Sequence, residues 1–493
     1  MISPSWLSGY YEGTTGPDTG NDAMNHLMTE RLGWLLDPGS FFLHGVDDNS
    51  ELIGGTGTIG GRRVCIIAIN PEATAKVDPF DILQKELELL DLAEREHLPL
   101  IHLADRPGRV AMETTAIPFA ILQTFIDPHG AGRIFARFGQ LSGIVPRIAV
   151  VFRPIATTLT YPVAECDTVV MVAQAGMSLA RPDMVKLMTG DPSSYAEYGG
   201  ARMHAEISGT CDMLAGSDKE ALEWVRSYIG YFPSSFGENP PCVQPVQPAR
   251  VSPFGVCRVP EDPNCAFDMH RVIDVFIDEN SFLEHRADYA GEIITAFARV
   301  AGMPLGIIAN NSDVRGGILF PESCRKTAAF ASLCDAFNIP LVFLADTPGF
   351  MVGKSAEQAG IIHNGALVFS TLANLSVPHL CIVVRKAYTA GFYAMGGAGF
   401  GPDRLLALPT ADITIYGMKA IDRLADEQHL PDASRETLKE FAHESTGIAH
   451  YLESGYLDGI ISLGEIRNHV EQFLQSAYAA PPRRDRPGRV LCL

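Results

Sequence analysis

The stretch that decides the fold occurs twice in the chain. Residues 97–105 read HLPLIHLAD and residues 338–346 read NIPLVFLAD, two apolar runs with the same Leu-Ala-Asp ending about 240 residues apart. Two more pairs follow in the same order: GGRRVCIIAIN (60–70) with AGMPLGIIANN (301–311), and IVPRIAVVFRPIATTLTY (144–161) with SVPHLCIVVRKAYTAGFY (376–393). Three matched pairs in one order indicate an internal duplication.

Each half alternates short β-rich runs with stretches of helical period. The runs are continuously apolar: IAVVF (148–152), VVMVA (169–173) and LCIVV (380–384). Such runs predict strands of an α/β sheet that is covered by helices on both faces. Helical period predicts helices over 82–94, 220–229, 290–300, 434–442 and 463–477.

A proline-rich segment divides the two halves. In residues 237–265 prolines recur every few positions and neither helical nor strand periodicity survives. We therefore expect an N-terminal domain over 1–240, a linker over 241–265 and a C-terminal domain over 266–493.

The composition limits the function classes. The 493 residues carry 38 Lys+Arg against 58 Asp+Glu, a net charge of −20, and no basic run is present. Nucleic acid and anionic membranes are therefore excluded as expected partners. With only 19% charged residues, we expect buried subunit contacts and an oligomer.

The hydropathy of the chain and its cysteines bear on location and on metal binding. No apolar run approaches a membrane span and the start does not read as a signal peptide, which predicts a cytoplasmic protein. The ten cysteines lack metal-ligand spacing and are expected to be free, mostly buried thiols, so we expect no metal.

One glycine motif is misleading. Residues 55–60, GTGTIG, satisfy the dinucleotide fingerprint, but a β-rich run follows where a helix is required. A glycine-rich turn between two strands is the better interpretation. Lysine P-loop, zinc-protease and nucleophile-elbow motifs are all absent from the sequence.

Small-residue turns follow the matched strands 148–152 and 380–384. The first half has Ala156, Thr157 and Thr158, and the second has Tyr388, Thr389, Ala390 and Gly391. Backbone N–H groups at such a turn can converge on an anion such as an enolate oxygen. The alternative is that small residues only let a helix pack closely against a strand.

The second half resembles a known family. The segments from FDMHRVIDVF (267–276) to GMPLGIIANN (302–311), CDAFNIPLVFLADTPGF (334–350), GIIHNGA (360–366) and RKAYTAGFYAMGG (385–397) are similar to carboxyltransferase subunits of biotin-dependent acyl-CoA carboxylases. Propionyl-, acetyl- and methylcrotonyl-CoA carboxylases belong to this family. The first half agrees through RLGWLLDPGSF (31–41), GTGTIGGRRVC (55–65) and GGARMHAEISGTCD (199–212).

The resemblance implies an architecture and a reaction. It implies two tandem crotonase-like (ClpP/crotonase) α/β domains, each a ββα superhelix, with the N-domain on the acyl-CoA side and the C-domain on the biotin side. It also implies a hexamer built from dimers. Carboxybiotin on a separate carrier protein would supply the carboxyl group to the α-carbon of an acyl-CoA, because the chain has no Ala-Met-Lys-Met biotin-attachment sequence. A biotin carboxylase and carrier subunit are thus the implied partners.

The implied site residues follow from the motifs. Ala390 and Gly391 align with the backbone oxyanion hole for biotin, and Thr389 replaces the family's leading glycine there. Tyr388 and Tyr393 would line this site, and propionyl-type members have an aspartate in place of Tyr393 that helps to choose the acyl chain.

The acyl-CoA side departs further from the family. The thioester hole would fall on Thr157 and Thr158, beside Ala156, where the family has glycines. The family's Asp-Ser-Gly-Gly-Ala-Arg appears only as DRPGR (105–109), and its glycine-rich loop is replaced by NPEATAKVDPFD (70–81).

These departures keep two alternatives open. The chain could be a biotin-independent decarboxylase or acyl-transfer enzyme acting on a thioester, or a non-catalytic paralogous subunit. The retained Ala390-Gly391 turn favours the carboxyltransferase, whereas the Thr157-Thr158 turn favours the alternatives.

Other conspicuous residues have two interpretations each. His204 could contact substrate, although a structural hydrogen bond is the better expectation. Asp105 and Asp346 end matched strands, where they could serve a site or cap a helix. Arg153 and Arg385 could attract the anionic CoA or pair with a carboxylate.

Overall fold

The computed structural model describes residues 26–44, 50–73, 77–106, 125–248, 257–415, 447–482 and 487–491, with isolated positions between 423 and 437. The chain forms two compact units. Unit 1 extends to His204 and includes Met213–Ser227, and unit 2 takes Ala205–Asp212 and the chain from Tyr228 onward. Neither helix nor strand occurs in the described parts of the predicted linker, 241–248 and 257–265, whose role as a domain boundary stays a prediction.

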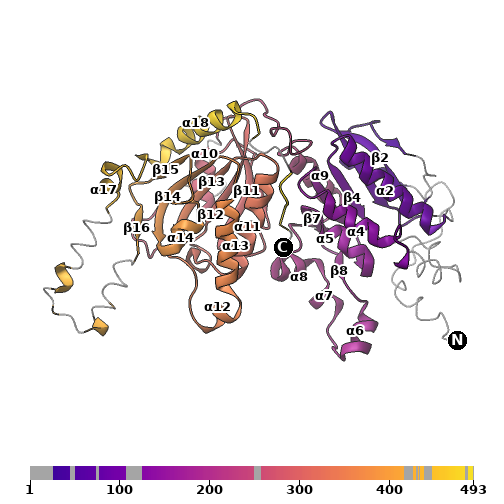
Figure 1. Cartoon of the computed structure of the whole chain (residues 1–493), viewed down its shortest axis with the longest axis horizontal. Helices are drawn as coiled ribbons and strands as arrows, with labels where there is room; N and C mark the ends of the chain where they lie inside the picture. Colours follow the sequence, from indigo (N-terminus) through magenta and orange to yellow (C-terminus); the bar gives the residue numbers. More distant parts are fainter. Residues whose placement is uncertain are drawn as a thin grey trace. The chain divides into compact units, whose positions relative to one another are not determined.

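Unit 1 is built on a seven-stranded sheet in the order β1-β2-β3-β4-β5-β7-β9 (Figure 1). The first three strands pair antiparallel and the others parallel. The short β6 and β8 pair parallel as a separate ribbon. The strands are β1 Phe42–Leu43, β2 Leu52–Ile59, β3 Arg62–Ile69, β4 Leu100–Ala104, β5 Arg147–Val151, β6 Pro154–Ala156, β7 Thr168–Val172, β8 Gly176–Ser178 and β9 Met213–Ala215.

Unit 2 repeats this order with β10-β11-β12-β13-β14-β15-β17, and β16 pairs with the end of β14. Again the first three strands are antiparallel and the rest parallel. The predicted duplication is therefore present in the topology. The strands are β10 Leu283–His285, β11 Ile293–Val300, β12 Met303–Asn310, β13 Leu341–Thr347, β14 His379–Tyr388, β15 Arg404–Ala407, β16 Asp412–Thr414 and β17 Gly459–Ile460.

The hairpin turns repeat in the same way. Gly60 and Gly61 join β2 to β3 with φ of 57° and 79°, and Ala301 and Gly302 join β11 to β12 with φ of 50° and 78°. Two consecutive left-handed residues match the twist of a two-residue hairpin. The two halves therefore share backbone conformation as well as strand order.

The helices of unit 1 follow and precede these strands. They are α1 His26–Leu35, α2 Pro79–Arg95, α4 Ala131–Gln140, α5 Thr160–Ala164, α6 Pro182–Thr189, α7 Tyr195–Tyr198, α8 Ala201–Met203 and α9 Asp218–Ile229, whose last two residues belong to unit 2. A 3-10 turn, Thr157–Leu159, precedes α5, and a π-turn, His204–Ser208, follows α8 and belongs to unit 2 from Ala205 onward.

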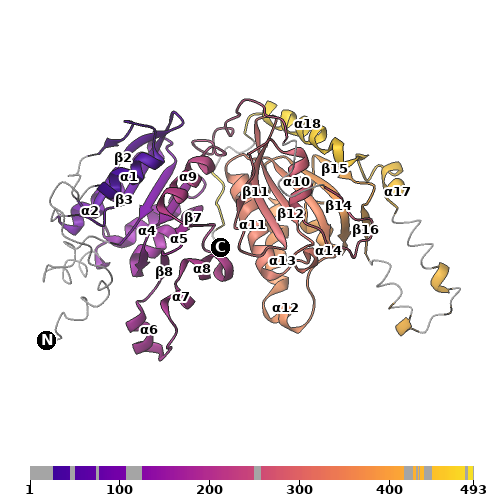
Figure 2. The same ribbon diagram turned by 180° about the vertical axis from the view of Figure 1, so that it is seen from behind.

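In unit 2, helices cover the sheet on both faces (Figure 2). Apolar side chains of α10 and α18 pack with one face of β11–β14 in a single buried cluster. On the other face α11 packs closely, because a Cβ on Gly306 of β12 would lie 2.6 Å from Cys334 Sγ. The helices are α10 His270–Phe276, α11 Pro321–Ala336, α12 Lys354–Gln358, α13 Ile361–Ala373, α14 Thr389–Ala394, α17 Ile448–Glu453 and α18 Ile466–Ala479.

The predicted elements are mostly confirmed. The apolar runs form β5, β7 and β14, and helices cover 82–94, 220–229 and 466–477. Most of the predicted helix 434–442 lies outside the described residues. The nine described cysteines are free thiols, six of them buried.

One prediction is wrong and one is confirmed in part. Residues 293–300 of the predicted helix 290–300 form β11, whose residues are all buried, so that the two-residue alternation of a half-exposed strand is lost. A glycine turn does join two strands at Gly60–Gly61, but residues 55–59 belong to β2 itself. The strand glycines give room instead, because a Cβ on Gly57 would lie 2.6 Å from Leu36 Cδ1. Within the described residues, no helix is both long and apolar enough to cross a bilayer.

Candidate active site

The turn after β6 in unit 1 has an unusual backbone. Ala156 is extended with φ −146° and ψ 164°, and Thr157, the first residue of the 3-10 turn that leads into α5, adopts φ 63°. Threonine rarely occupies this left-handed region, which glycine adopts freely. The Thr160 hydroxyl donates to the Thr157 carbonyl at 2.6 Å and so holds the turn to the start of α5.

The turn after β14 in unit 2 has the same form. Tyr388 is extended, with φ −100° and ψ 141°, Thr389 adopts φ 52°, and α14 begins at once. The first N–H groups of a helix have no acceptor within it, which leaves those of Ala390 and Gly391 available. The structure therefore brings Thr389, Ala390 and Gly391 together in unit 2 as it does Thr157 and Thr158 in unit 1.

Gly391 is required by close packing. A Cβ at this position would lie 2.7 Å from Gly349 Cα and 3.0 Å from Thr347 Cγ2. The loop after β13 thus lies directly against the turn. Gly349 itself has φ 114°, and a Cβ there would meet Thr389 Oγ1 at 2.8 Å.

Two tyrosines flank this second turn. The Tyr388 hydroxyl donates to Asp412 Oδ2 at 2.5 Å and joins the end of β14 to β16. Burial and this contact with Asp412 raise the pKa of Tyr388, so it stays a neutral donor. Tyr393 is 47% exposed, and its ring centroid lies 6.3 Å from that of Phe400.

The strand-end arginines Arg385 and Arg153 both lie close to carboxylates. Arg385 is buried and donates to both oxygens of Asp346 at 3.1 and 2.9 Å. Its third nitrogen donates to the Asp262 and Cys265 carbonyls. Asp346 is thus an ion-pair partner, which confirms the interpretation that Arg385 pairs with a carboxylate.

In unit 1 the equivalent carboxylate, that of Asp105, pairs with a different arginine. Asp105 pairs with Arg31 of α1 at 2.8 Å, and burial raises the Asp105 pKa although Arg31 opposes the shift. Arg31 also donates to Asp218 and lies 3.6 Å from the centre of the Phe152 ring. Arg153, the counterpart of Arg385, lies 3.7 Å from Asp218. Sequence reasoning missed Arg31, because nothing in the repeat points to α1.

His204 is structural, as expected. Its Nε2 lies 2.8 Å from the Met177 carbonyl, and burial lowers its pKa, so the ring stays neutral.

The departures in unit 1 are only partly described. Of the segment 105–109, residues 107–109 lie outside the described residues, and so do 74–76 of the replaced loop. The rest of that loop leads into α2, where the Asp78 side chain accepts from Phe80 N at 2.8 Å as an N-cap.

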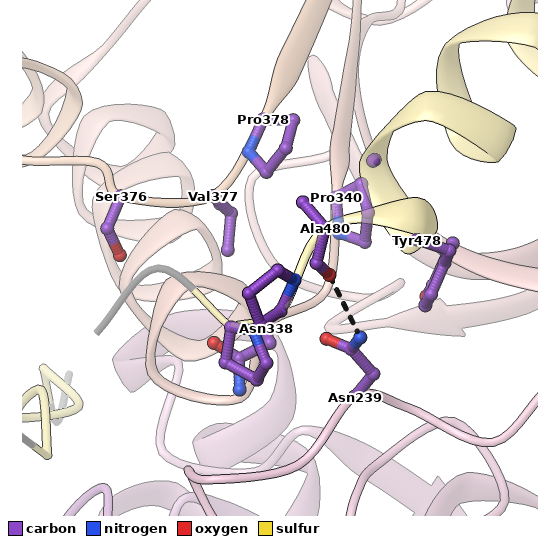
Figure 3. A pocket seen from close by; sticks show the side chains of 11 residues that line it. Asn239, Asn338, Pro340, Ser376, Val377, Pro378, Tyr478 and Ala480 are labelled. Atoms are coloured by element: carbon purple, nitrogen blue, oxygen red, sulfur yellow. Dashed lines mark hydrogen bonds between the residues drawn. The ribbon is translucent and has the colours of Figure 1, made fainter. Parts of the chain in front are cut away.

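One small hollow lies away from both turns. It measures about 20 Å³ and is lined in part by Asn239, Asn338 and Tyr478; Asn239 donates to the Ala480 carbonyl at 3.3 Å (Figure 3). None of the predicted site residues reaches it. Among the residues that the structure describes, no three His, Cys, Asp or Glu side chains are grouped as metal ligands.

Known proteins are similar to this chain in sequence and fold. A family model described as the carboxyl transferase domain matches residues 25–489. An uncharacterised carboxylase of Bacillus subtilis is 38% identical over 468 residues, which cover 91% of this chain and 90% of that protein. The propionyl-CoA carboxylase beta chain of Saccharopolyspora erythraea is 31% identical over 485 residues, 90% of this chain and 86% of its own.

A solved structure agrees over nearly the whole length. The crystal structure of transcarboxylase 12S, reported as a hexamer assembly with methylmalonyl-CoA and methylmalonic acid bound, superposes with a TM-score of 0.82 at 28% identity. The match covers 95% of this chain and 94% of that one. It confirms the predicted fold class, an α/β fold of carboxyltransferase type.

Proposed function

The chain belongs to the carboxyl transferase family, and from that premise we propose that it moves a carboxyl group from carboxybiotin to the α-carbon of an acyl-CoA. The carboxybiotin is supplied on a separate carrier protein by a biotin carboxylase partner. We further propose a hexameric assembly, the state described for transcarboxylase 12S.

The observation that supports this proposal most is the pair of matched turns. Each unit places a threonine with φ of 63° or 52° between an extended residue and the first residues of a short helix. The proposed reaction passes through two oxyanions, one on the biotin ring and one on the thioester. Two equivalent turns give one backbone donor set for each.

Unit 2 suits the biotin side. Carboxybiotin supplies carbon dioxide and the base that removes the α-proton of the acyl group. The N–H groups of Ala390 and Gly391 would stabilise the negative charge that develops on the ureido oxygen. One preorganised donor of this kind contributes about 2.7–4 kcal/mol to a transition state. The loop at Gly349 packs directly against this turn.

Unit 1 suits the thioester side. The N–H groups of Thr157 and Thr158 would receive the enolate oxygen of the acyl-CoA, whose α-carbon then attacks carbon dioxide. Thr157 keeps the left-handed φ that the family's glycine would adopt. The change of residue type therefore leaves the backbone donors in place, which favours the carboxyltransferase over the decarboxylase and non-catalytic alternatives.

Tyr388 and Tyr393 have different roles in this proposal. Tyr388 positions the turn through Asp412, and its hydroxyl is already engaged there. Tyr393 is exposed beside Gly391 and would form a bulky wall of the site, where propionyl-type members have an aspartate. Ala156 and Thr389 lead into the two turns and shape them.

The test is transfer from a carboxylated biotin carrier to a panel of acyl-CoAs, measured as carboxylated product. Gly391→Val should lower the rate at least about 100-fold, because it obstructs the donors. A Cβ on Gly132 meets nothing within 4 Å, so Gly132→Val serves as the control. Thermal unfolding of both variants separates misfolding from loss of chemistry.

Two results would contradict the proposal. Full activity of Gly391→Val would remove the biotin-side assignment. If no acyl-CoA is carboxylated while a malonyl-type thioester loses carbon dioxide without biotin, the biotin-independent alternative is correct.

A further inference from the structure

Unit 1 contains a cleft of about 430 Å³ next to the Thr157 turn. Its walls come from α5, from β8 with the chain after it, from α6 and from the region of α7 and α8. Two residues of its walls are linked directly to the turn. Ser178 of its wall is the parallel partner of Ala156, and Thr160 of its wall is bonded to the Thr157 carbonyl.

The walls of this cleft are uncharged and largely apolar. The residues that line it include Tyr161, Ala164, Met177, Leu179 and Val185. No Asp, Glu, Lys or Arg is among the residues that line it. A charged group in this cleft would have no partner of opposite charge among the lining residues, so we expect an uncharged ligand group there.

Two polar side chains of the lining are already hydrogen-bonded. Thr160 Oγ1 donates to the Thr157 carbonyl, and His204 Nε2 contacts the Met177 carbonyl. The hydroxyl oxygens of Ser178 and Tyr198 are buried and have no hydrogen-bond partner among the described residues, and Tyr161, which is 47% exposed, carries a third hydroxyl. A hydrocarbon chain fits these mostly apolar walls better than the pantetheine arm of CoA, whose amides need hydrogen-bond partners.

From this geometry we infer that the cleft receives the acyl group, and that the preferred substrate carries an unbranched or branched hydrocarbon chain of about eight or more carbons. The inference rests on the proposed function, in which Thr157 and Thr158 hold the thioester. A cavity of about 150 Å³ accommodates benzene, so this cleft has room for a chain well beyond propionyl.

The wall of the cleft that α6 forms is exposed. None of the residues of α6 is buried, and Leu179 before it is 64% exposed. A chain lying in the cleft would cover this apolar surface. Each buried methylene should raise kcat/KM by about fourfold until the cleft is full.

The experiment compares propionyl-CoA, octanoyl-CoA and dodecanoyl-CoA as acceptors from carboxylated biotin carrier. Val185→Phe narrows the cleft, and Leu187→Phe places the same ring on the same helix at a site that is 78% exposed and outside the lining. We expect octanoyl-CoA to exceed propionyl-CoA at least tenfold in kcat/KM. Val185→Phe should lower octanoyl-CoA turnover at least tenfold with propionyl-CoA within twofold, and Leu187→Phe should change neither.

Other outcomes overturn the inference without touching the proposed function. Carboxylation of propionyl-CoA in preference to octanoyl-CoA would do so. An equal effect of Val185→Phe on all three thioesters would place the pantetheine arm in the cleft instead. If no thioester is carboxylated, the proposed function fails, and calorimetric binding of the same three CoA esters to the two variants still decides what the cleft holds.

Discussion

Replacement of Thr157 by glycine should stabilise unit 1. A left-handed backbone costs a residue with a side chain about 1–2 kcal/mol. Glycine removes that cost but loses about 0.5–1 kcal/mol more conformational entropy on folding than a residue with a side chain. With φ at 63°, the balance favours Thr157→Gly by about 0.5–1 kcal/mol.

Urea unfolding followed by tryptophan fluorescence measures this change in one unit. Of the three tryptophans in the chain, Trp34 and Trp224 lie in unit 1, and none follows position 224. The unfolding midpoint should rise for Thr157→Gly. Thr189→Gly is the control, because Thr189 is exposed and ends α6 in ordinary helical conformation, and its midpoint should fall by the equivalent of about 0.5 kcal/mol.

The activity of the same variant tests the backbone assignment. The donors of the proposed thioester hole are main-chain N–H groups, so Thr157→Gly should keep the rate of transfer within about threefold. A midpoint that falls as in Thr189→Gly would refute the argument from strain. A 100-fold loss of rate in a stable protein would show that the threonine hydroxyl takes part in the reaction.

Two further predictions concern unit 2. Burial alone would lower the pKa of His270, but the side chains of Glu284 and Asp268, at 3.1 and 2.6 Å from its ring nitrogens, raise it. The stability that these contacts add is therefore present below the unfolded pKa of about 6.5 and is lost as the pH rises through the folded pKa. Unfolding followed by circular dichroism should show this decline above pH 6.5, and a His270→Gln variant that declines equally would contradict it. Arg385→Met leaves the buried Asp346 with only Lys386, whose Nζ lies 3.6 Å from its Oδ1, and should cost about 3 kcal/mol of unfolding free energy in the same assay. A loss below about 1 kcal/mol would mean that Lys386 and water replace the pair.

The repeat allowed the fold to be predicted further than periodicity alone. Matched strands at 60–70 and 301–311, and at 97–105 and 338–346, fall where the sequence places them, because continuous apolar runs are typical of parallel strands that are covered on both faces. The same coverage explains the error at 290–300. β11 is buried along its whole length between β10 and β12, so its sequence carries no alternation that separates it from a buried helix.

Only those parts of the site that lie close together in the sequence could be predicted. The two turns lie within a few residues of the strands that the repeat identifies. The partner of Asp105 comes from 74 residues away, and Asp412 reaches Tyr388 from a strand after the next. No spacing rule relates such residues, because tertiary packing alone brings them together.

The two turns differ in their surroundings rather than in their backbone. Both adopt the glycine-like φ with threonine in place of glycine, so strand order and the following helix determine the conformation more strongly than residue type does. Beside the first turn lies an uncharged cleft, and beside the second lie Tyr393 and the buried Asp346 pair. If duplication supplied two equal donor sets, then the choice of substrate depends on those neighbours, the cleft beside the first turn and Tyr393 beside the second. Substitutions in the walls should therefore change which substrate is used, and substitutions in the turns should change only how fast it reacts.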